Sequence, residues 1–373
     1  IPQDGGIHTQ SSTSIYYNTP GTYYVNQFAY NSVYSDNWDD PIPITVHPKP
    51  DPNFNVPIDP ICKDAVAYFT NTSTITPLPI TIPETITNHN WYVEELSGGG
   101  LINVNSYIVW NIITGLPDLE YTFSNAGTWV VTLECESDNV TCNCIEQFET
   151  TVFVHDLPTA NFTSIFNPSC VDNNVVFNGN YGISGGSTLS STSFALIEWD
   201  WDFGNSNTYT STTDGDANET YSPPMSYNVT LIITDDNNCI SLPKTNTIVV
   251  EPLPISSFTS TTECLGITTQ LDGSLSSSST DTWIWKIFDP QENGGFTIQT
   301  TTTPSHNYTF STPGYHTVIL STFSTLSNGQ VCVSSPFTQQ VYVYDVPQPS
   351  FSFNIACEDN LLDVNEITNF IDQ

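Results

Sequence analysis

Two stretches of the chain, residues 197–204 and 227–236, alternate apolar and polar residues with a period of two. This period is typical of a strand that has one face in a hydrophobic core. The inward-facing sets are Ile197, Trp199, Trp201 and Phe203 in the first stretch, and Tyr227, Val229, Leu231 and Ile233 in the second. We therefore predict that the two strands share one core, in which tryptophan is the largest side chain.

The pairing of a tryptophan-bearing strand with a later strand rich in valine and leucine recurs along the chain. Residues 90–93 and 127–133 carry one further copy, and residues 282–288 and 313–320 carry another. Recurrence of one supersecondary unit at a near-constant interval indicates a repeat protein. We expect each copy to have a core of its own, so that the copies add in series.

Short joints that contain proline separate these copies. Pro158, Pro254 and Pro347 lie 96 and 93 residues apart, the size of one β-sandwich of roughly seven strands. Proline stiffens a connection and cannot extend a sheet. The sequence therefore predicts an all-β chain of tandem modules: the C-terminal part of a module at 1–48, complete modules at 53–155, 158–251 and 254–345, and the N-terminal part of a further module at 349–373.

Three segments of the chain carry a family resemblance. Residues 201–204 read Trp-Asp-Phe-Gly, residues 306–308 read His-Asn-Tyr, and residues 313–320 read Pro-Gly-Tyr-His-Thr-Val-Ile-Leu. This series resembles the PKD domain, an immunoglobulin-like β-sandwich, although Asn205 and Ser206 replace the Asp-Gly that the family usually has next. The resemblance implies an elongated rod of PKD-type sandwiches. Tandem modules of this acidic, threonine-rich kind are similar to giant surface adhesins and gliding-motility proteins of gliding bacteria.

The charge balance is strongly acidic, with 39 acidic residues against four lysines and no arginine. Nucleic-acid binding needs a basic surface, which this composition excludes. Attraction to an anionic membrane is excluded for the same reason, and no apolar run approaches the roughly 18 residues of a membrane helix. The acidic surface favours solubility or the binding of a divalent cation.

Calcium is the only cofactor that the sequence suggests, and none is required by the fold. Calcium takes six to eight oxygen ligands, several of them carboxylates, but no cluster has the Asp-x-Asp-x-Asp-Gly spacing of a calcium loop. A run such as Asp-Asp-Asn-Asn at 235–238 is also an ordinary turn at a strand end, which is the interpretation we favour. The candidate calcium ligands are Asp200, Asp202, Asp235 and Asp236.

Four of the nine cysteines fall at matching places in two successive modules. Cys170 and Cys264 each follow the first strand of a module, and Cys239 and Cys332 each follow the late strand. We predict the disulfides Cys170–Cys239 and Cys264–Cys332, each within one module. A closed loop of about 70 residues stabilises a fold by roughly 4 kcal/mol in the chain-entropy model. Disulfides of this kind indicate an oxidising, extracellular setting.

The other cysteines leave two pairings open. In the module before these two, either Cys62 pairs with Cys142, and Cys135 with Cys144, or Cys62 pairs with Cys144. Cys357 occupies the opening position of a further module, and we expect its partner beyond the last residue. The chain also starts without a methionine, so we expect a processed product or a window of a longer protein.

No constellation of catalytic residues is evident, and we predict that the protein is not an enzyme. The six histidines are scattered, and no phosphate-binding loop or His-Glu-x-x-His occurs. His306 is interpreted as a structural contact near a turn.

The tryptophan pairs have two interpretations. Trp199 and Trp201 share a strand face, as do Trp283 and Trp285, and exposed aromatics of this kind could form a sugar-binding platform. The family resemblance favours core positions instead, with at least one member of each pair buried.

Asn-x-Ser/Thr sequences add candidate glycosylation sites, provided that the host modifies them. The candidates are Asn71, Asn139, Asn161, Asn218 and Asn307, with Asn228 set aside because it lies in a predicted strand.

These observations favour an extracellular structural or adhesive stalk, a part of a long cell-surface or filament protein. Its expected partners are further modules of the same chain, surface glycans or other cell-surface proteins. One alternative is a filament subunit assembled by strand exchange, in which 349–373 of one chain completes 1–48 of the next. The cysteines argue against it, because residues 26–48 contain none. Another alternative is a carbohydrate-binding accessory region of a secreted hydrolase.

Overall fold

The chain folds almost entirely as β-strands. The computed structural model describes residues 14–26, 28–30, 35–37, 40–57, 60–76, 85–96, 100–111, 113–137, 144–180, 195–290, 295–353 and 364–368. Within these ranges the only helical element is the short 3-10 turn η1, Asn105–Tyr107. No helix in the described part is long and apolar enough to cross a membrane. The prediction of an all-β chain of tandem sandwiches is confirmed at the level of fold class.

The structure consists of two compact units, which are described separately. The first contains Ile1–Ala160, Ser187–Glu198 and Ile232–Leu242, and the second contains Asn161–Gly186, Trp199–Leu231 and Pro243–Gln373.

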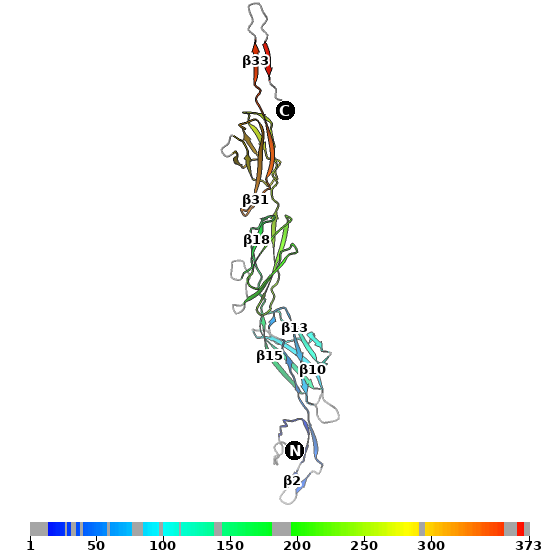
Figure 1. The fold of residues 1–373 in the computed structure, drawn as a ribbon. Helices are drawn as coiled ribbons and strands as arrows, with labels where there is room; N and C mark the ends of the chain where they lie inside the picture. The colour runs from blue at the N-terminus through cyan, green and yellow to red at the C-terminus, as the bar shows by residue number, and fades with distance from the viewer. Residues whose placement is uncertain are drawn as a thin grey trace, which may run out of the picture. The chain divides into compact units, whose positions relative to one another are not determined.

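The first unit contains one complete pair of sheets, here called the first sandwich (Figure 1). One sheet has the order β11-β10-β14-β15-β7: Ile102–Asn103, Ile86–Glu95, Gly127–Ser137, Ile145–His155 and Ile61–Cys62. The other has the order β12-β13-β8-β6: Ile108–Trp110, Pro117–Thr122, Val66–Asn71 and Phe54–Asn55. Three two-stranded pairs accompany it: β1 Gly21–Val25 with β4 Ile42–Val46, β2 Phe28–Tyr30 with β3 Ser35–Asn37, and β5 Pro50–Asp51 with β9 Thr74–Ile75.

The core of the first sandwich lies between its two sheets. Trp91 on β10 pairs in register with Leu133 on β14, and both side chains are fully buried. Leu119 from the opposite sheet belongs to the same core. The indole N–H of Trp91 donates to the carbonyl oxygen of Pro117 at 3.1 Å, which satisfies its one polar group. The tryptophan strand and the late strand therefore meet as the alternation predicts.

Two further pairs of sheets follow in the chain. The second sandwich has a three-stranded sheet β16-β18-β21, which is Thr163–Ile165, Asn174–Asn178 and Asp216–Thr220. Its five-stranded sheet β17-β23-β22-β19-β20 is Ser169–Cys170, Lys244–Glu251, Ser226–Asp235, Leu196–Asp202 and Thr208–Ser211.

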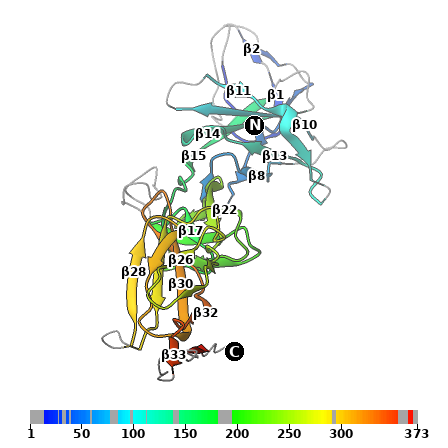
Figure 2. The same cartoon turned by 90° about the horizontal axis from the view of Figure 1, so that it is seen from above.

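The third sandwich repeats this plan (Figure 2). Its smaller sheet β24-β26-β29 is Thr259–Ser260, Thr269–Asp272 and Ser305–Tyr308. Its larger sheet β25-β32-β30-β27-β28 is Glu263–Cys264, Phe337–Tyr344, Gly314–Thr325, Thr282–Ile287 and Thr297–Thr301, with β31 Val331–Val333 paired to β30. The last pair of strands is β33 Pro349–Phe353 with β34 Val364–Thr368.

All four paired tryptophans are core residues, so the platform interpretation fails for them. Trp199, Trp201, Trp283 and Trp285 are buried. A Cβ placed on Gly179 would lie 3.0 Å from both Trp201 Cζ2 and Leu231 Cδ2, so these two side chains share one core as predicted. His306 stacks on Trp285 with ring centroids 6.1 Å apart, which agrees with a structural role.

Candidate functional site

One feature recurs in all three sandwiches: a two-residue strand places a cysteine beside the end of the closing strand. The three short strands β7, β17 and β25 each run parallel to the closing strand of their own sandwich. The paired residues are Cys62 with His155, Cys170 with Glu251, and Cys264 with Tyr344.

The turn that follows each of these cysteines, here called the opening turn, has the same hydrogen bonds in all three sandwiches. The amide after the cysteine donates to the closing strand: Lys63 to His155 O at 2.8 Å, Val171 to Glu251 O at 2.9 Å, and Leu265 to Tyr344 O at 2.8 Å. The second residue after the cysteine has a positive φ, at Asp64, Asp172 and Gly266. Asp and Gly tolerate that conformation better than most residues.

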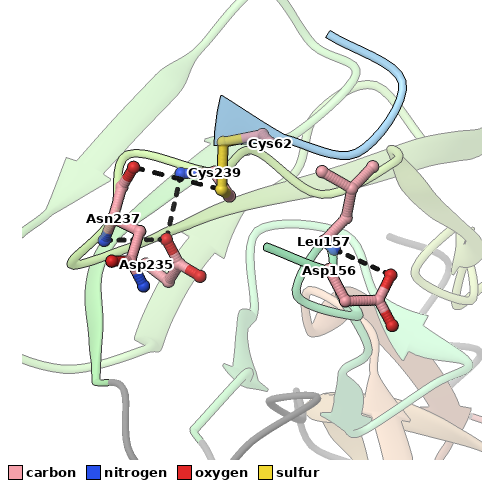
Figure 3. Close-up of a disulfide and its surroundings, with 6 residues drawn as sticks. All are labelled: Cys62, Asp156, Leu157, Asp235, Asn237 and Cys239. Atoms are coloured by element: carbon pink, nitrogen blue, oxygen red, sulfur yellow. Dashed lines mark hydrogen bonds between the residues drawn. A yellow bond between two sulfur atoms is a disulfide. The ribbon is translucent and has the colours of Figure 1, made fainter. Parts of the chain in front are cut away.

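A second recurring element, here called the late hairpin, follows the late strand, which is β22 in the second sandwich and β30 in the third. In the second sandwich it carries Cys239, whose amide donates to the buried carboxylate of Asp235 at 2.9 Å (Figure 3). The same carboxylate accepts from the amide of Asn237 at 3.0 Å. In the third sandwich β31 carries Cys332, which pairs with Ser324 of β30.

Both late hairpins contain the sequence Cys-x-Ser, and the serine holds the hairpin to the late strand. Ser241 donates its amide to Ile233 O at 2.9 Å and accepts from Ile233 N at 3.0 Å through its hydroxyl. Ser334 makes the same two bonds to Thr322, both at 2.9 Å. These serines were not predicted from the sequence, although the repeated Cys-x-Ser at 239–241 and 332–334 marks both of them.

Two disulfides link an opening turn to the late hairpin of the following sandwich. Cys62 is bonded to Cys239, and Cys170 is bonded to Cys332. The sequence separations are 177 and 162 residues. The predicted pairs Cys170–Cys239 and Cys264–Cys332 are therefore wrong, and so is the pairing of Cys62 with Cys142 or Cys144.

Strand geometry explains why the pairing within a sandwich fails. In the third sandwich, Cys264 lies beside Tyr344, one position from the register pair Val343 and Gly314. Cys332 pairs with Ser324, at the other end of β30. Ten residues of strand span about 33 Å, whereas bonded cysteines have Cα atoms roughly 4.4–6.8 Å apart. Matching places in the sequence identify equivalent cysteines, but they do not tell which end of the sandwich each one occupies.

The remaining cysteines differ in their surroundings. Cys144 is disulfide-bonded, whereas Cys135 is a free, fully buried thiol with its Sγ 3.4 Å from Ser73 Oγ, so the predicted pair Cys135–Cys144 is wrong. Burial raises the pKa of Cys135 to about 11, which keeps it protonated and unreactive. Cys264 is free and exposed. Cys142 and Cys357 lie outside the described residues.

The candidate calcium ligands do not converge. Asp200 accepts from the Thr210 hydroxyl at 2.6 Å, and Asp202 accepts from the Gly204 amide at 2.9 Å. Asp235 is buried and its Oδ1 serves the late hairpin, whereas Asp236 is exposed. Across the described ranges no group of three or more His, Cys, Asp or Glu residues is placed to hold a metal. Asp235 thus has the turn-forming role that the sequence favoured.

The candidate glycosylation sites divide by exposure. Asn71 is fully buried, and its side chain donates to Pro117 O at 3.3 Å and accepts from Ser73 N at 2.9 Å, so it is not an acceptor in the folded chain. Asn218 on β21 and Asn307 on β29 are exposed, and Asn161 is half-buried. Asn139 lies outside the described residues.

Two lysines form ion pairs in the first unit. Lys63, next to Cys62 in the opening turn, lies 3.7 Å from Asp156, and Lys49 pairs with Glu146. Both pairs are exposed to solvent, where such contacts contribute little stability.

Comparisons with known proteins identify no family for this chain. No protein-family model and no curated protein matches the sequence. Among solved structures the chain is similar to the chicken CNTN1 FN1–FN3 domains, at 8% identity and a TM-score of 0.27, over 80% of this chain and 98% of that one. It is also similar to fibronectin(III)-like modules of Clostridium thermocellum CbhA, at 10% identity and a TM-score of 0.27, over 49% and 94% of the two chains.

A third similar structure contains carbohydrate-binding modules from the β-sandwich superfamily, at 19% identity and a TM-score of 0.23, over 57% of this chain and 83% of that one. Similarities at these TM-scores are too weak to define a family. The chain is an all-β protein of successive β-sandwiches, which its own sheets show.

Proposed function

We propose that the chain is a non-enzymatic stalk of an extracellular surface or filament protein, built to carry load through PKD-like modules. The observation that supports this role most directly is the pattern of disulfides between opening turns and late hairpins of successive sandwiches. Such bonds belong to oxidising compartments. The strongly acidic composition suits a solvent-exposed spacer.

The order of the bonded cysteines along the chain supports the load-bearing role. Cys170 lies inside the loop closed by Cys62 and Cys239, and Cys332 lies outside it, so the two loops interleave. Under tension, the shortest covalent path from Cys62 to Cys332 crosses to Cys239, runs back along 69 residues of backbone to Cys170 and crosses to Cys332. Of the 270 residues between Cys62 and Cys332, 201 are thereby withheld from extension even after the modules unfold.

Single-molecule stretching of the full chain tests this role. Complete unfolding in reductant should release roughly 680 Å more contour length than unfolding without reductant, at about 3.4 Å per residue for the 201 withheld residues. A chain carrying Cys62→Ser and Cys239→Ser should gain only roughly 130 Å without reductant, at about 3.4 Å per residue, because Cys170–Cys332 still withholds its own loop and the shortest path becomes the 108 residues from position 62 to Cys170. Equal contour lengths in the two conditions would contradict the proposal that these bonds limit extension.

A further inference from the structure

Cys264 occupies the position that forms a disulfide in both preceding sandwiches. It ends a two-residue strand that runs parallel to the closing strand, as Cys62 and Cys170 do. Its carbonyl accepts from the third amide after it, Ile267, at 2.9 Å, as those of Cys62 and Cys170 accept from Ala65 at 3.2 Å and from Asn173 at 3.1 Å. The backbone of its opening turn is therefore already arranged as at the two bonded cysteines.

The surroundings of Cys264 differ from those of the bonded cysteines in their exposure. Cys170 is 1% exposed and Cys62 is half-buried, whereas Cys264 is exposed. The register partner of Cys62, His155, is 8% exposed, while Tyr344, the register partner of Cys264, is 50% exposed. The opening turn of the third sandwich thus presents a thiol and an aromatic ring that a covering element would bury.

No described cysteine is available to be the partner of Cys264. Cys332 is bonded to Cys170, and it belongs to the opposite end of the third sandwich. Cys135 is buried in the core of the first sandwich. The two observed disulfides indicate the kind of partner, because each joins an opening turn to the late hairpin of the sandwich that follows it. The expected partner of Cys264 is therefore a cysteine in the late hairpin of a following sandwich.

We propose that Cys264 is the attachment site for the cysteine of a Cys-x-Ser late hairpin in a further module of the same polypeptide, C-terminal to the third sandwich. Cys239 and Cys332 lie 93 residues apart, and the partner is expected at a similar interval after Cys332. The bond would interleave with Cys170–Cys332 as that bond interleaves with Cys62–Cys239. The inference rests on the repeated geometry and does not depend on the load-bearing role.

The bond forms by thiol–disulfide exchange with a protein disulfide as the oxidant. The hairpin thiolate attacks the oxidant and forms a mixed disulfide, and the oxidant releases one thiol. The Cys264 thiolate then attacks the hairpin sulfur and expels the second oxidant thiol. Two thiols of the chain have lost two protons and two electrons, and the oxidant disulfide has become a dithiol.

The exposed thiol is tested first on the unmodified chain. Native protein treated with a maleimide without reductant should take up the label at Cys264 and not at Cys135, as located by peptide mass mapping. Cys264→Ser should remove that label and leave the Cys62–Cys239 and Cys170–Cys332 peptides unchanged. Failure of Cys264 to react, because it is buried or bonded within the chain, would overturn the proposal.

The partner is tested with an extended chain in which a second copy of residues 254–346 is inserted between Val346 and Pro347. The insert supplies a late hairpin at the proposed interval. We expect Cys264 of the first copy to be disulfide-linked to Cys332 of the second, with the original Cys170–Cys332 bond retained as the sign of correct folding. With Cys264→Ser in the first copy, Cys332 of the second copy should become reactive to maleimide. A chain that keeps Cys170–Cys332 but leaves the first Cys264 reactive, or links it elsewhere, would refute the inference.

Discussion

At the scale of single residues, glycines set how closely the tryptophans pack. The indole N–H of Trp199 donates to Gly179 O, and that of Trp283 donates to Gly273 O, both at 3.3 Å. A Cβ on Gly273 would lie 2.9 Å from Trp283 Cδ1. The two sandwiches therefore share a contact of indole against bare backbone, which periodicity in the sequence does not reveal because glycine has no side chain to count.

Gly215→Ala is expected to destabilise the second sandwich by about 1–3 kcal/mol through overpacking. Its Cβ would lie 2.5 Å from Trp199 Nε1 and 2.7 Å from the backbone of Gly179, and rigid backbone cannot yield as a side-chain tip would. Urea denaturation followed by tryptophan fluorescence measures the change. Gly100→Ala is the matched control, because nothing lies within 4 Å of its added methyl. Equal midpoints for the two variants would contradict the packing argument.

His306 should make the third sandwich sensitive to acid. Its ring lies on Trp285, its Nε2 is buried without a hydrogen bond, and burial lowers its pKa. The unfolded chain therefore binds the proton more readily, so this contribution to stability is complete above a pH of about 6.5 and is lost as the pH falls. Thermal unfolding at pH 7.5 and 5.0 should show a smaller acid-induced loss for His306→Gln than for the native chain. An unchanged loss would contradict this role.

At the scale of elements, the alternation predicted the long strands and missed the short ones. β10, β19, β22, β27 and β30 bury one face, so their sequence has a period of two. The strands β7, β17 and β25 have two residues each, too few to show a period. These short strands place the cysteines of the opening turns. All five cysteines that the structure shows to be bonded, Cys62, Cys144, Cys170, Cys239 and Cys332, were predicted to form disulfides, but so were the free Cys135 and Cys264. The partners of Cys62, Cys170, Cys239 and Cys332 were predicted wrongly, because they depend on elements without a pattern.

Ser334→Ala tests the role of serine in the late hairpin. Its buried hydroxyl accepts from Thr322 N and bonds Ser256 Oγ, so its removal leaves an amide without a partner at a cost of about 1–3 kcal/mol. We expect a lower unfolding midpoint and faster reduction of Cys170–Cys332 by dilute dithiothreitol. Ser335→Ala, at the adjacent exposed position, is the control and should change neither. Native-like reduction kinetics in Ser334→Ala would contradict the proposed holding role.

At the scale of the whole molecule, the net charge of −35 dominates the response to ions. Like charges repel, and the repulsion is screened over about 10 Å at 0.1 M salt. The melting temperature should therefore rise between 10 and 500 mM NaCl. Calcium chloride at equal ionic strength should give the same rise if the acid groups only need screening. A saturable further rise specific to calcium would contradict this, because no group of carboxylates in the described ranges is placed to hold a metal.

The interleaved order of the bonds also decides what a protease can do to the molecule. Had each bond closed within one module, a single cut in the proline joint at 251–254 would separate the chain into two pieces. With Cys62 joined to Cys239 and Cys170 joined to Cys332, a cut at any one peptide bond between residues 62 and 332 leaves both fragments tied by at least one disulfide. A nicked molecule would still migrate as one species without reductant and would come apart only when its disulfides are reduced.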